Sequence, residues 1–150
     1  MSRKVFVAGV GMVPFSKPGA SEPYDAMGAA AALAALADAG VAYVDVQQAY
    51  AGYVYGDSTA GQKALYHVDM TGIPVFNVNN NCSTGSTALF LARQAVETGV
   101  ADCALALGFE QMMPGALGTH FNDRPTPFDD FNRETDALVA LAHAAGGDRP

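Results

Sequence analysis

The sequence predicts an α/β fold with a parallel β-sheet, and three observations support this prediction. Short runs of apolar residues alternate along the chain with longer segments of helical periodicity. Glycines and prolines that favour turns separate these segments. Half of the residues are hydrophobic and only 15% are charged, which suits a packed core and excludes a disordered chain. Strands that alternate with helices at these lengths form parallel βαβ units.

The first two predicted strands flank an alanine-rich helix. Residues 4–10 form a continuous apolar run, which is typical of a strand buried on both faces. After a loop, Ser21 or Asp25 can cap a helix that ends at Gly40, a residue suited to the left-handed conformation of a helix end. Residues 48–55 alternate weakly between apolar and polar, and we predict the second strand there.

The same alternation continues towards the C-terminal part of the chain. The remaining predicted elements are a short helix over 59–70, a strand over 73–79, a helix over 83–98 and a strand over 102–107. From residue 113 the composition changes to a loop rich in glycine, proline, asparagine and aspartate, and a last helix is predicted over 133–145. A loop of this length inside a compact domain is usually functional or incompletely packed.

The segment around Cys82 organises the predicted fold, because a strand turns into a helix there. The residues before it are apolar and largely β-branched or aromatic: Ile73, Val75, Phe76 and Val78. Three asparagines that favour a turn follow: Asn79, Asn80 and Asn81. Cys82 therefore lies at or just before a helix N-terminus, where free N–H groups and the helix dipole stabilise an anion. A thiolate there suits acyl transfer, because it attacks a carbonyl and the helix end stabilises the developing charge. The alternative is that Cys82 is a small buried hydrophobe.

Residues beside Cys82 are candidates for orienting the nucleophile or lining its pocket. Asn81 can orient the thiol or bond across a dimer, and the alternative is a polar turn whose side chains bond locally. Ser83 offers a hydroxyl that can cap the helix. Gly85 allows a ligand or another chain to approach the first helical turn.

Further candidates lie after the last predicted strand. Glu110 and Met112 are placed where loops after parallel strands host ligands; the alternative is a solvated carboxylate and a packing methionine. His120 is a candidate for lining the path of an acyl group or coenzyme A, although a lone loop histidine is usually polar surface. Cys103 lies inside an apolar strand, and we interpret it as structural.

Composition excludes several classes of function. The net charge of −7 argues against a nucleic-acid partner, which requires clustered Lys and Arg. No apolar segment approaches the ~20 residues of a membrane span, and the apolar run near the N-terminus is too short for a signal peptide. No cluster has the spacing of metal ligands, and the two cysteines are expected to be free thiols. We therefore predict a cytoplasmic protein without a bound metal.

Four stretches carry a family resemblance: residues 7–12 with Phe15 beyond, 79–88, 107–112, and 115–118 followed by Asp123 and Arg124. Together they resemble the thiolase superfamily, and most closely the thiolases of the sterol carrier protein X type and their lipid-transfer relatives. The stretch over 79–88, which looks like the nucleophile segment, is the most specific. The resemblance runs in register from about residue 4 to about residue 131.

The resemblance implies an incomplete thiolase-like half-domain with a βαβαβαβ order over residues 1–112, lacking its last strand, and the start of a loop domain over 113–150. Cys82 matches the nucleophile that takes an acyl group from a 3-oxoacyl-CoA, and its backbone N–H matches part of an oxyanion hole. Coenzyme A is then a substrate, and no permanently bound cofactor is expected. The strand over 73–79 is expected to pair across a homodimer.

The chain also departs from the family pattern. The family's catalytic histidines and second catalytic cysteine come from a C-terminal half, and none of His67, His120 and His143 matches them. The resemblance thus implies an N-terminal fragment that is nearly inactive alone, because removing a general base costs ~10²–10⁴-fold in rate. Two alternatives remain open. One is a steroid side-chain retro-aldolase acting with a CoA-binding partner protein, and the other is a catalytically inactive truncated chain.

Overall fold

The computed structural model describes residues 3–116, 118 and 121–146. These residues belong to two compact units, Met1–Ala116 and Leu117–Pro150. The first unit contains a three-stranded sheet, and the second contains a single described helix.

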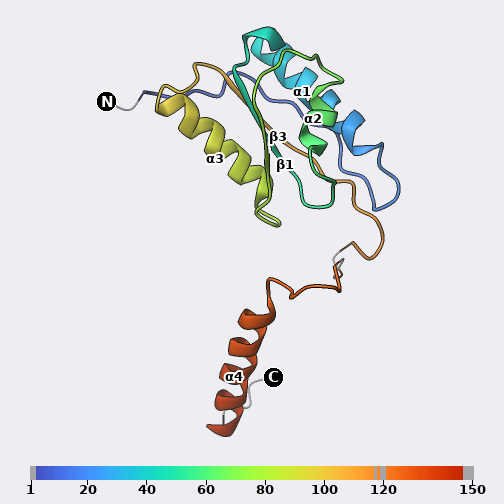
Figure 1. Ribbon diagram of the computed structural model, residues 1–150, viewed down its shortest axis with the longest axis vertical. Helices are drawn as coiled ribbons and strands as arrows, with labels where there is room; N and C mark the ends of the chain where they lie inside the picture. The colour runs from blue at the N-terminus through green and yellow to red at the C-terminus, as the bar shows by residue number, and fades with distance from the viewer. Residues whose placement is uncertain (1–2, 117, 119–120, 147–150) are drawn as a thin grey trace. The chain divides into compact units, whose positions relative to one another are not determined.

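The sheet of the first unit is parallel throughout, with the strand order β2-β1-β3. Its strands are β1 (Gln48–Gly52), β2 (Val75–Val78) and β3 (Ala104–Gly108). Helices α1 (Tyr24–Ala39) and α2 (Ala60–Leu65) cover one face, and α3 (Thr84–Glu97) covers the other (Figure 1). The α/β fold with a parallel sheet is therefore confirmed.

Side chains of alternating strand residues enter two different hydrophobic clusters, one on each face of the sheet. Ala49, Leu105 and Leu107 pack with α1 and α2, whereas Tyr50 packs with the alanines of α3. This period of two follows from the pleat of a β-strand. Most of the buried hydrophobic residues are alanines, so the helices approach the sheet closely.

The helix ends depart from the predicted capping. Helix α1 begins after Pro23, and neither Ser21 nor Asp25 caps it, because Asp25 already lies in its first turn. Its C-terminus agrees with the prediction, since Gly40 has φ 65° and its N–H bonds to helix carbonyls. A short 3₁₀ helix, Tyr43–Asp45, then leads into β1.

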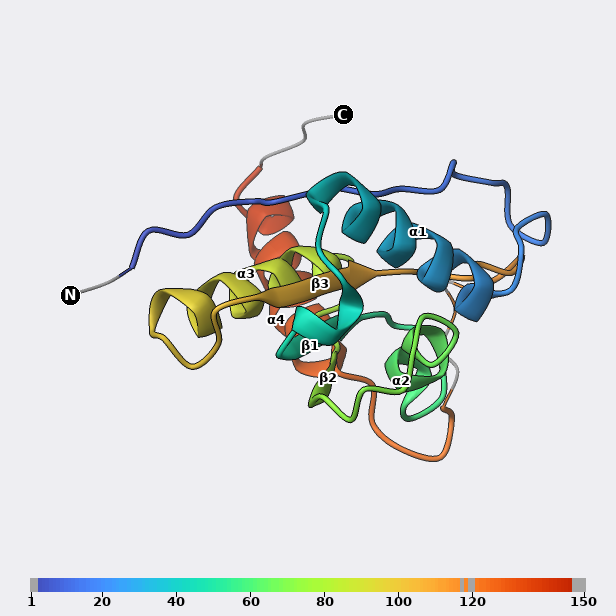
Figure 2. The same cartoon turned by 90° about the horizontal axis from the view of Figure 1, so that it is seen from above.

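The predicted first strand is wrong, because residues 4–10 have no strand partner. Strands β1 and β3 pair directly with each other, and the N-terminal segment instead lies extended along α1 (Figure 2). A Cβ atom added to Gly9 would come within 2.5 Å of the Ala35 carbonyl oxygen, so glycine permits this approach. The Val10 N–H donates to Asp38 Oδ2 at 2.8 Å. An apolar run alone does not determine which neighbour it packs against.

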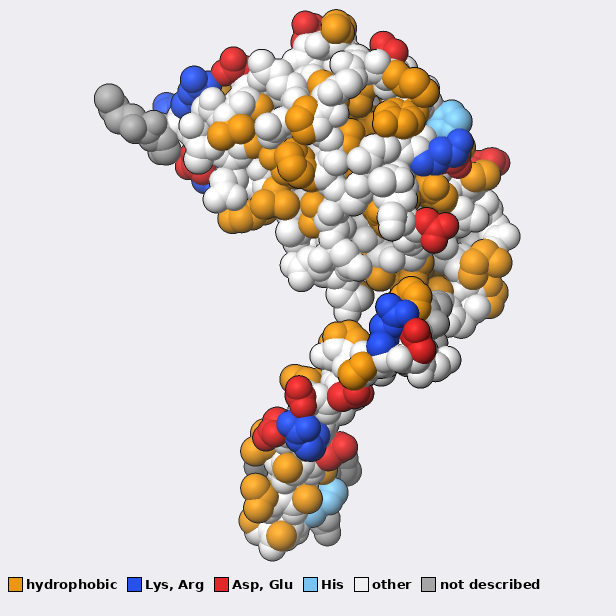
Figure 3. All heavy atoms as spheres, viewed as in Figure 1, with side chains coloured by type: hydrophobic (Ala, Val, Ile, Leu, Met, Phe, Trp, Pro, Cys, Tyr) orange, Lys and Arg blue, Asp and Glu red, His pale blue; other side chains and the backbone are white. Residues whose placement is uncertain are grey.

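In the second unit, helix α4 (Asp129–Ala144) begins four residues earlier than the helix predicted over 133–145. Asp129 lies in its first turn, and its carboxylate accepts a hydrogen bond from the Thr126 N–H at 3.1 Å. No side chain of α4 is buried within the described residues of this unit. Hydrophobic side chains, including Phe131, Leu138 and Leu141, are exposed along it (Figure 3). Within the described ranges, none of the helices has the length and apolar character needed to cross a membrane.

Candidate functional site

Cys82 lies at the carboxyl end of the sheet, in the turn that joins β2 to α3. Its thiol is free and exposed. Helix α3 begins at Thr84, so Cys82 precedes the first helical residue by two positions, with Ser83 at the N-cap. The predicted strand-to-helix corner is therefore present in the structure.

A left-handed residue forms the turn. Asn81 has φ 49°, a conformation that asparagine tolerates better than most residues, and its N–H donates to Asn79 Oδ1 at 3.1 Å. The Cys82 Sγ lies 3.7 Å from Asn81 Oδ1, within the range of a weak thiol hydrogen bond. Asn81 thus contacts the thiol directly, and its role in orienting the thiol stays a prediction.

Ser83 does not cap α3 through its side chain. Its hydroxyl donates to the Asn80 carbonyl at 2.8 Å, and its N–H reaches the same oxygen at 3.1 Å. The side chain therefore tightens the turn that carries Cys82. The predicted capping hydrogen bond from Ser83 is absent from the described contacts of α3.

Thr84 closes the turn from the helix side. Its side chain is buried, with 6% exposure, and its Oγ1 accepts the Asn80 N–H at 2.5 Å. The same hydroxyl lies 3.3 Å from the Val78 carbonyl, to which it donates. The bonds to residues four and six positions earlier depend on the shape of the turn.

Two glycines at the ends of neighbouring strands lie beside the first turn of α3. Gly52 and Gly108 are register partners in β1 and β3. A Cβ added to Gly52 would come within 2.7 Å of the Thr84 carbonyl oxygen, and one on Gly108 would lie 3.4 Å from Gly85 Cα. Gly85 itself has open space where its own Cβ would be. Sequence reasoning missed Gly52, although a glycine at a strand end is a signal of close backbone approach.

Glu110 binds the loop after β1. Its two carboxylate oxygens accept the Val54 N–H at 2.9 Å and the Tyr55 N–H at 3.0 Å. The carboxylate is half-buried, and this arrangement ties together the segments that follow β1 and β3. Met112 is half-buried, and its carbonyl accepts the Gly19 N–H at 3.0 Å. His120 lies outside the described residues.

Cys103 has different surroundings from Cys82. It is half-buried against the cluster beneath α1 and α2. Burial raises the pKa of its thiol above the usual range, and the nearby Asp45 carboxylate raises it further. A cysteine in this setting is predominantly a thiol at neutral pH.

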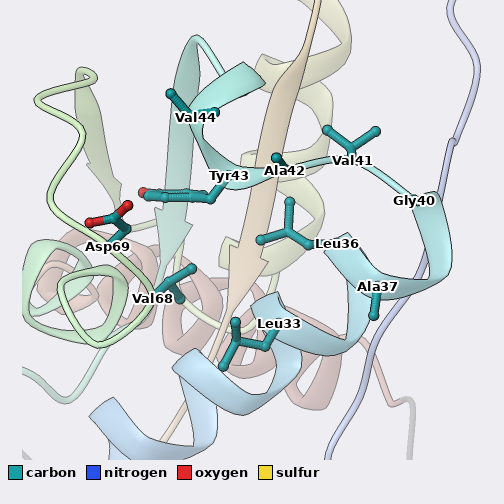
Figure 4. Close-up of a pocket in the computed structure, with 10 residues that line it drawn as sticks. All are labelled: Leu33, Leu36, Ala37, Gly40, Val41, Ala42, Tyr43, Val44, Val68 and Asp69. Atoms are coloured by element: carbon teal, nitrogen blue, oxygen red, sulfur yellow. The ribbon is translucent and has the colours of Figure 1, made fainter.

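Two surface pockets lie at opposite ends of the strands. A pocket of about 210 Å³ is formed by residues that follow β1 and by the end of β2, including Tyr53, Asn77 and Asn79. A pocket of about 530 Å³ lies at the C-terminal end of α1, where Leu33, Leu36, Tyr43 and Asp69 surround it (Figure 4). The smaller pocket adjoins the segment that leads to Cys82. The larger pocket is lined by residues that come before β1 and β2 in the sequence. No three potential metal-ligating side chains gather among the residues that the structure describes.

Comparison with known proteins identifies the family. Residues 5–127 match the family model described as "Thiolase, N-terminal domain". This chain belongs to the thiolase family. The resemblance inferred from the segment around Cys82 is thereby confirmed.

The relatives of this thiolase-family chain are longer proteins. Sterol carrier protein 2 from Gallus gallus is 59% identical over 131 residues, which cover 86% of this chain and 24% of that protein. Benzoylsuccinyl-CoA thiolase subunit BbsB from Thauera aromatica is 37% identical over 124 residues, covering 81% of this chain and 32% of the other. The chain thus spans about a quarter to a third of the length of these relatives.

A solved structure described as "Ltp2-ChsH2(DUF35) aldolase" has the same fold over most of this chain. The two superpose with a TM-score of 0.57 at 21% sequence identity, covering 95% of this chain and 34% of the other. At this identity the likeness concerns the fold alone, and it agrees with the α/β thiolase-like arrangement seen here.

Proposed function

We propose that this chain carries the nucleophile of a thiolase-type acyl transfer on CoA thioesters, and that the nucleophile is Cys82. The observation that carries the proposal is the exposed Cys82 thiol, two residues before the first residue of α3, in a chain of the thiolase family. A sulfur at a helix N-terminus lies where free backbone N–H groups favour negative charge.

In the proposed reaction, the Cys82 sulfur attacks the 3-oxo carbon of a 3-oxoacyl-CoA. The bond between carbons 2 and 3 then breaks, and its electron pair stays on the departing acyl-CoA, which takes up a proton. The shortened acyl chain remains on Cys82 as a thioester until the thiol of a second coenzyme A displaces it. Asn81, Ser83 and Gly85 lie around the sulfur in this proposal, whereas Glu110 acts through the loop after β1. Contacts of Met112 and His120 with the substrate stay predictions.

The names of the relatives support a substrate class. Sterol carrier protein 2 points to a lipid or sterol-derived acyl chain, and benzoylsuccinyl-CoA thiolase points to a CoA thioester. Because the chain spans about a quarter of the first relative's length, the complete reaction is part of the proposal. Formation of the acyl-cysteine is the step that this chain can be tested for.

The test is acylation of the 150-residue chain by octanoyl-CoA in excess, followed by peptide mass spectrometry. The reaction exchanges one thioester for another: the Cys82 thiol becomes an octanoyl thioester and free coenzyme A is released. We expect the label on Cys82, loss of the label in Cys82→Ser, and retention of it in the matched control Cys103→Ser. Equal labelling of Cys82 and Cys103 in the folded chain would remove the basis of the proposal.

A retro-aldolase is the second candidate, favoured by the fold shared with the aldolase structure over 95% of this chain. Such an enzyme cleaves a 3-hydroxyacyl-CoA and needs no acyl-cysteine. In this proposal a CoA-binding protein is the partner. Loss of a 3-hydroxyacyl-CoA when that partner is added, unchanged in Cys82→Ser, would favour the lyase over the acyltransferase. A chain with neither activity would agree with the inactive alternative.

The assembly and its location belong to the same proposal. Strand β2 lies at the edge of the described sheet, and its outer side, where the Val75 carbonyl accepts the Gln62 Nε2 at 3.2 Å, is the proposed place for pairing with a second copy through residues 73–79. We propose a cytoplasmic homodimer whose half-domain covers residues 1–112 and whose loop domain begins at residue 113. Sedimentation of the chain and of a Phe76→Lys variant tests the dimer, because Phe76 lies on β2 and is 46% exposed. An unchanged mass in the variant would argue against pairing at this edge.

A further inference from the structure

We propose that Thr84 is a positioning residue that fixes the orientation of Cys82, and that Gly52 is the surface against which Thr84 is held. The inference rests on the proposed function, since it takes Cys82 as the nucleophile. It goes further by assigning the orientation of the sulfur to a buried hydroxyl and to a glycine in a different strand.

The Thr84 hydroxyl joins both sides of the turn. It donates to the Val78 carbonyl at the end of β2 and accepts the Asn80 N–H within the turn. The Thr84 N–H in turn donates to the Asn81 carbonyl at 3.1 Å. Cys82 thus lies inside a loop that one side chain closes at its base.

The Asn80 side chain extends this closure along α3. Asn80 Nδ2 donates to Thr87 Oγ1 at 2.9 Å, and the Thr87 hydroxyl donates to the Ser83 carbonyl at 3.0 Å. The turn is therefore attached to the first turn of α3 at two points. Thr84 differs from Thr87 in being buried, so water does not replace its hydrogen bonds.

Gly52 fixes the position of Thr84 against the sheet. A Cβ on Gly52 would come within 2.7 Å of the Thr84 carbonyl oxygen and 2.9 Å of its Cγ2. The Gly52 carbonyl also accepts the Phe109 N–H at 3.1 Å, which ties the end of β1 to the residue after β3. The first turn of α3 therefore lies on a backbone that is itself held on both sides.

The position of the sulfur relative to the helix N-terminus then depends on Thr84. The sulfur has a weak contact with Asn81 Oδ1 at 3.7 Å. The shape of the turn lies in its backbone, where Asn81 has φ 49°. Loss of the hydroxyl removes the acceptor of the Asn80 N–H and leaves the Val78 carbonyl bonded to the Tyr53 N–H, at 3.2 Å, without its link to α3. The turn is then free to move Cys82 relative to the first turn of α3.

The experiment compares Thr84→Val, which removes the hydroxyl at nearly constant shape, with Thr84→Ser, which keeps it. The matched control is Thr98→Val at the other end of α3, where the hydroxyl donates to the Gln94 carbonyl at 2.8 Å. The readout is the rate of Cys82 alkylation by iodoacetamide in the folded chain, divided by the rate at Cys103 in the same molecule. Urea midpoints of all variants are measured alongside.

We expect Thr84→Val to lower the Cys82 ratio about tenfold, which is below the ~10²-fold cost of a 1 Å misplacement. Thr84→Ser should keep the ratio of the wild type. Thr98→Val should also leave the ratio unchanged, even if this variant is less stable. A Thr84→Val ratio equal to that of the wild type would overturn the inference.

A second variant covers the case in which Thr84→Val does not fold. Gly52→Ala removes no hydrogen-bonding group of the turn, but its Cβ would come within 2.7 Å of the Thr84 carbonyl oxygen, so the Cys82 ratio should fall again. An unchanged ratio in folded Gly52→Ala would contradict the inference. Failure of the proposed function is a separate result: wild-type Cys82 is then not acylated by octanoyl-CoA, whatever the alkylation ratios are.

Discussion

At the scale of single residues, the two cysteines show how neighbours determine the reactivity of a thiol. Cys82 is exposed in a turn that local side chains hold in shape. Cys103 is half-buried one position before β3, and both burial and the Asp45 carboxylate raise its pKa. The same side chain is therefore available to reagents at one position and protected at the other.

We predict that Cys103 reacts slowly with iodoacetamide at pH 7, because a raised pKa leaves little of the thiolate. Its rate should continue to rise at pH values above the usual thiol range. Asp45→Asn removes one cause of the shift and should increase the Cys103 rate at neutral pH. Peptide mass spectrometry at timed intervals measures both cysteines in one sample. A Cys103 rate that is high at pH 7 and independent of pH would contradict this assignment.

Residue-level predictions succeeded where the chemistry is local. The apolar strand, the three asparagines and the change to helical spacing were sufficient to place Cys82 at a corner. The role of Glu110 required knowledge of Val54 and Tyr55, whose N–H groups it binds from 55 and 56 positions away in the sequence. Spacing along the chain carries no signal for such a contact.

At the scale of secondary-structure elements, Asp25 links α1 to α2 and to the residues that follow α2. Asp25, in the first turn of α1, lies 2.9 Å from His67 Nε2 and 3.5 Å from Lys63 Nζ. The hydrogen bond with His67 is the main cause that lowers the pKa of Asp25, and Lys63 contributes less. The carboxylate form therefore stabilises the packing of the two helices.

The lowered pKa of Asp25 predicts a pH dependence of stability. The folded-state pKa of Asp25 is lowered, so its contribution is fully present above its unfolded-state pKa of about 3.9. It is lost as the pH falls below that value and through the folded-state pKa. Asp25→Asn should reduce stability at pH 7 and weaken the loss of stability in acid.

Urea unfolding at pH 7, 4 and 3 measures this effect. Asp136→Asn makes the same change of charge on α4, where no side chain is buried, and should leave the acid loss unchanged. Equal pH profiles for wild type and Asp25→Asn would show that the cluster has no energetic role.

Helix α2 has only six residues, so its stability depends on packing rather than on its own hydrogen bonds. Leu65, at its end, is fully buried in the cluster beneath α1. We predict that Leu65→Ala lowers the free energy of unfolding by about 2–5 kcal/mol, because it leaves a cavity. Leu141→Ala on α4, where the side chain is 67% exposed, should change it by no more than about 0.5 kcal/mol. Chemical denaturation of both variants decides between these outcomes.

At the scale of the whole molecule, the alternation of strands and helices predicted the parallel sheet, and the match to the thiolase family agrees with it. The prediction of a first strand over residues 4–10 failed because apolar residues can pack against more than one kind of neighbour. Phe6 and Val7 are 80% and 73% exposed beside α1, so burial did not decide where this segment lies. A strand forms only where its backbone pairs with that of another strand, and the backbone of residues 9–10 contacts α1 instead.

The alanine-rich core has a thermodynamic consequence. A methyl group removes less apolar surface from water than the side chain of leucine or phenylalanine, and Leu65 is the largest fully buried side chain among the described residues. The heat capacity change of unfolding should therefore fall below the usual ~12–15 cal/mol/K per residue. Calorimetry of the chain should record a broad stability curve that declines slowly on both sides of its maximum. A packing of small side chains thus widens the range of temperatures over which the fold of this thiolase-family chain persists.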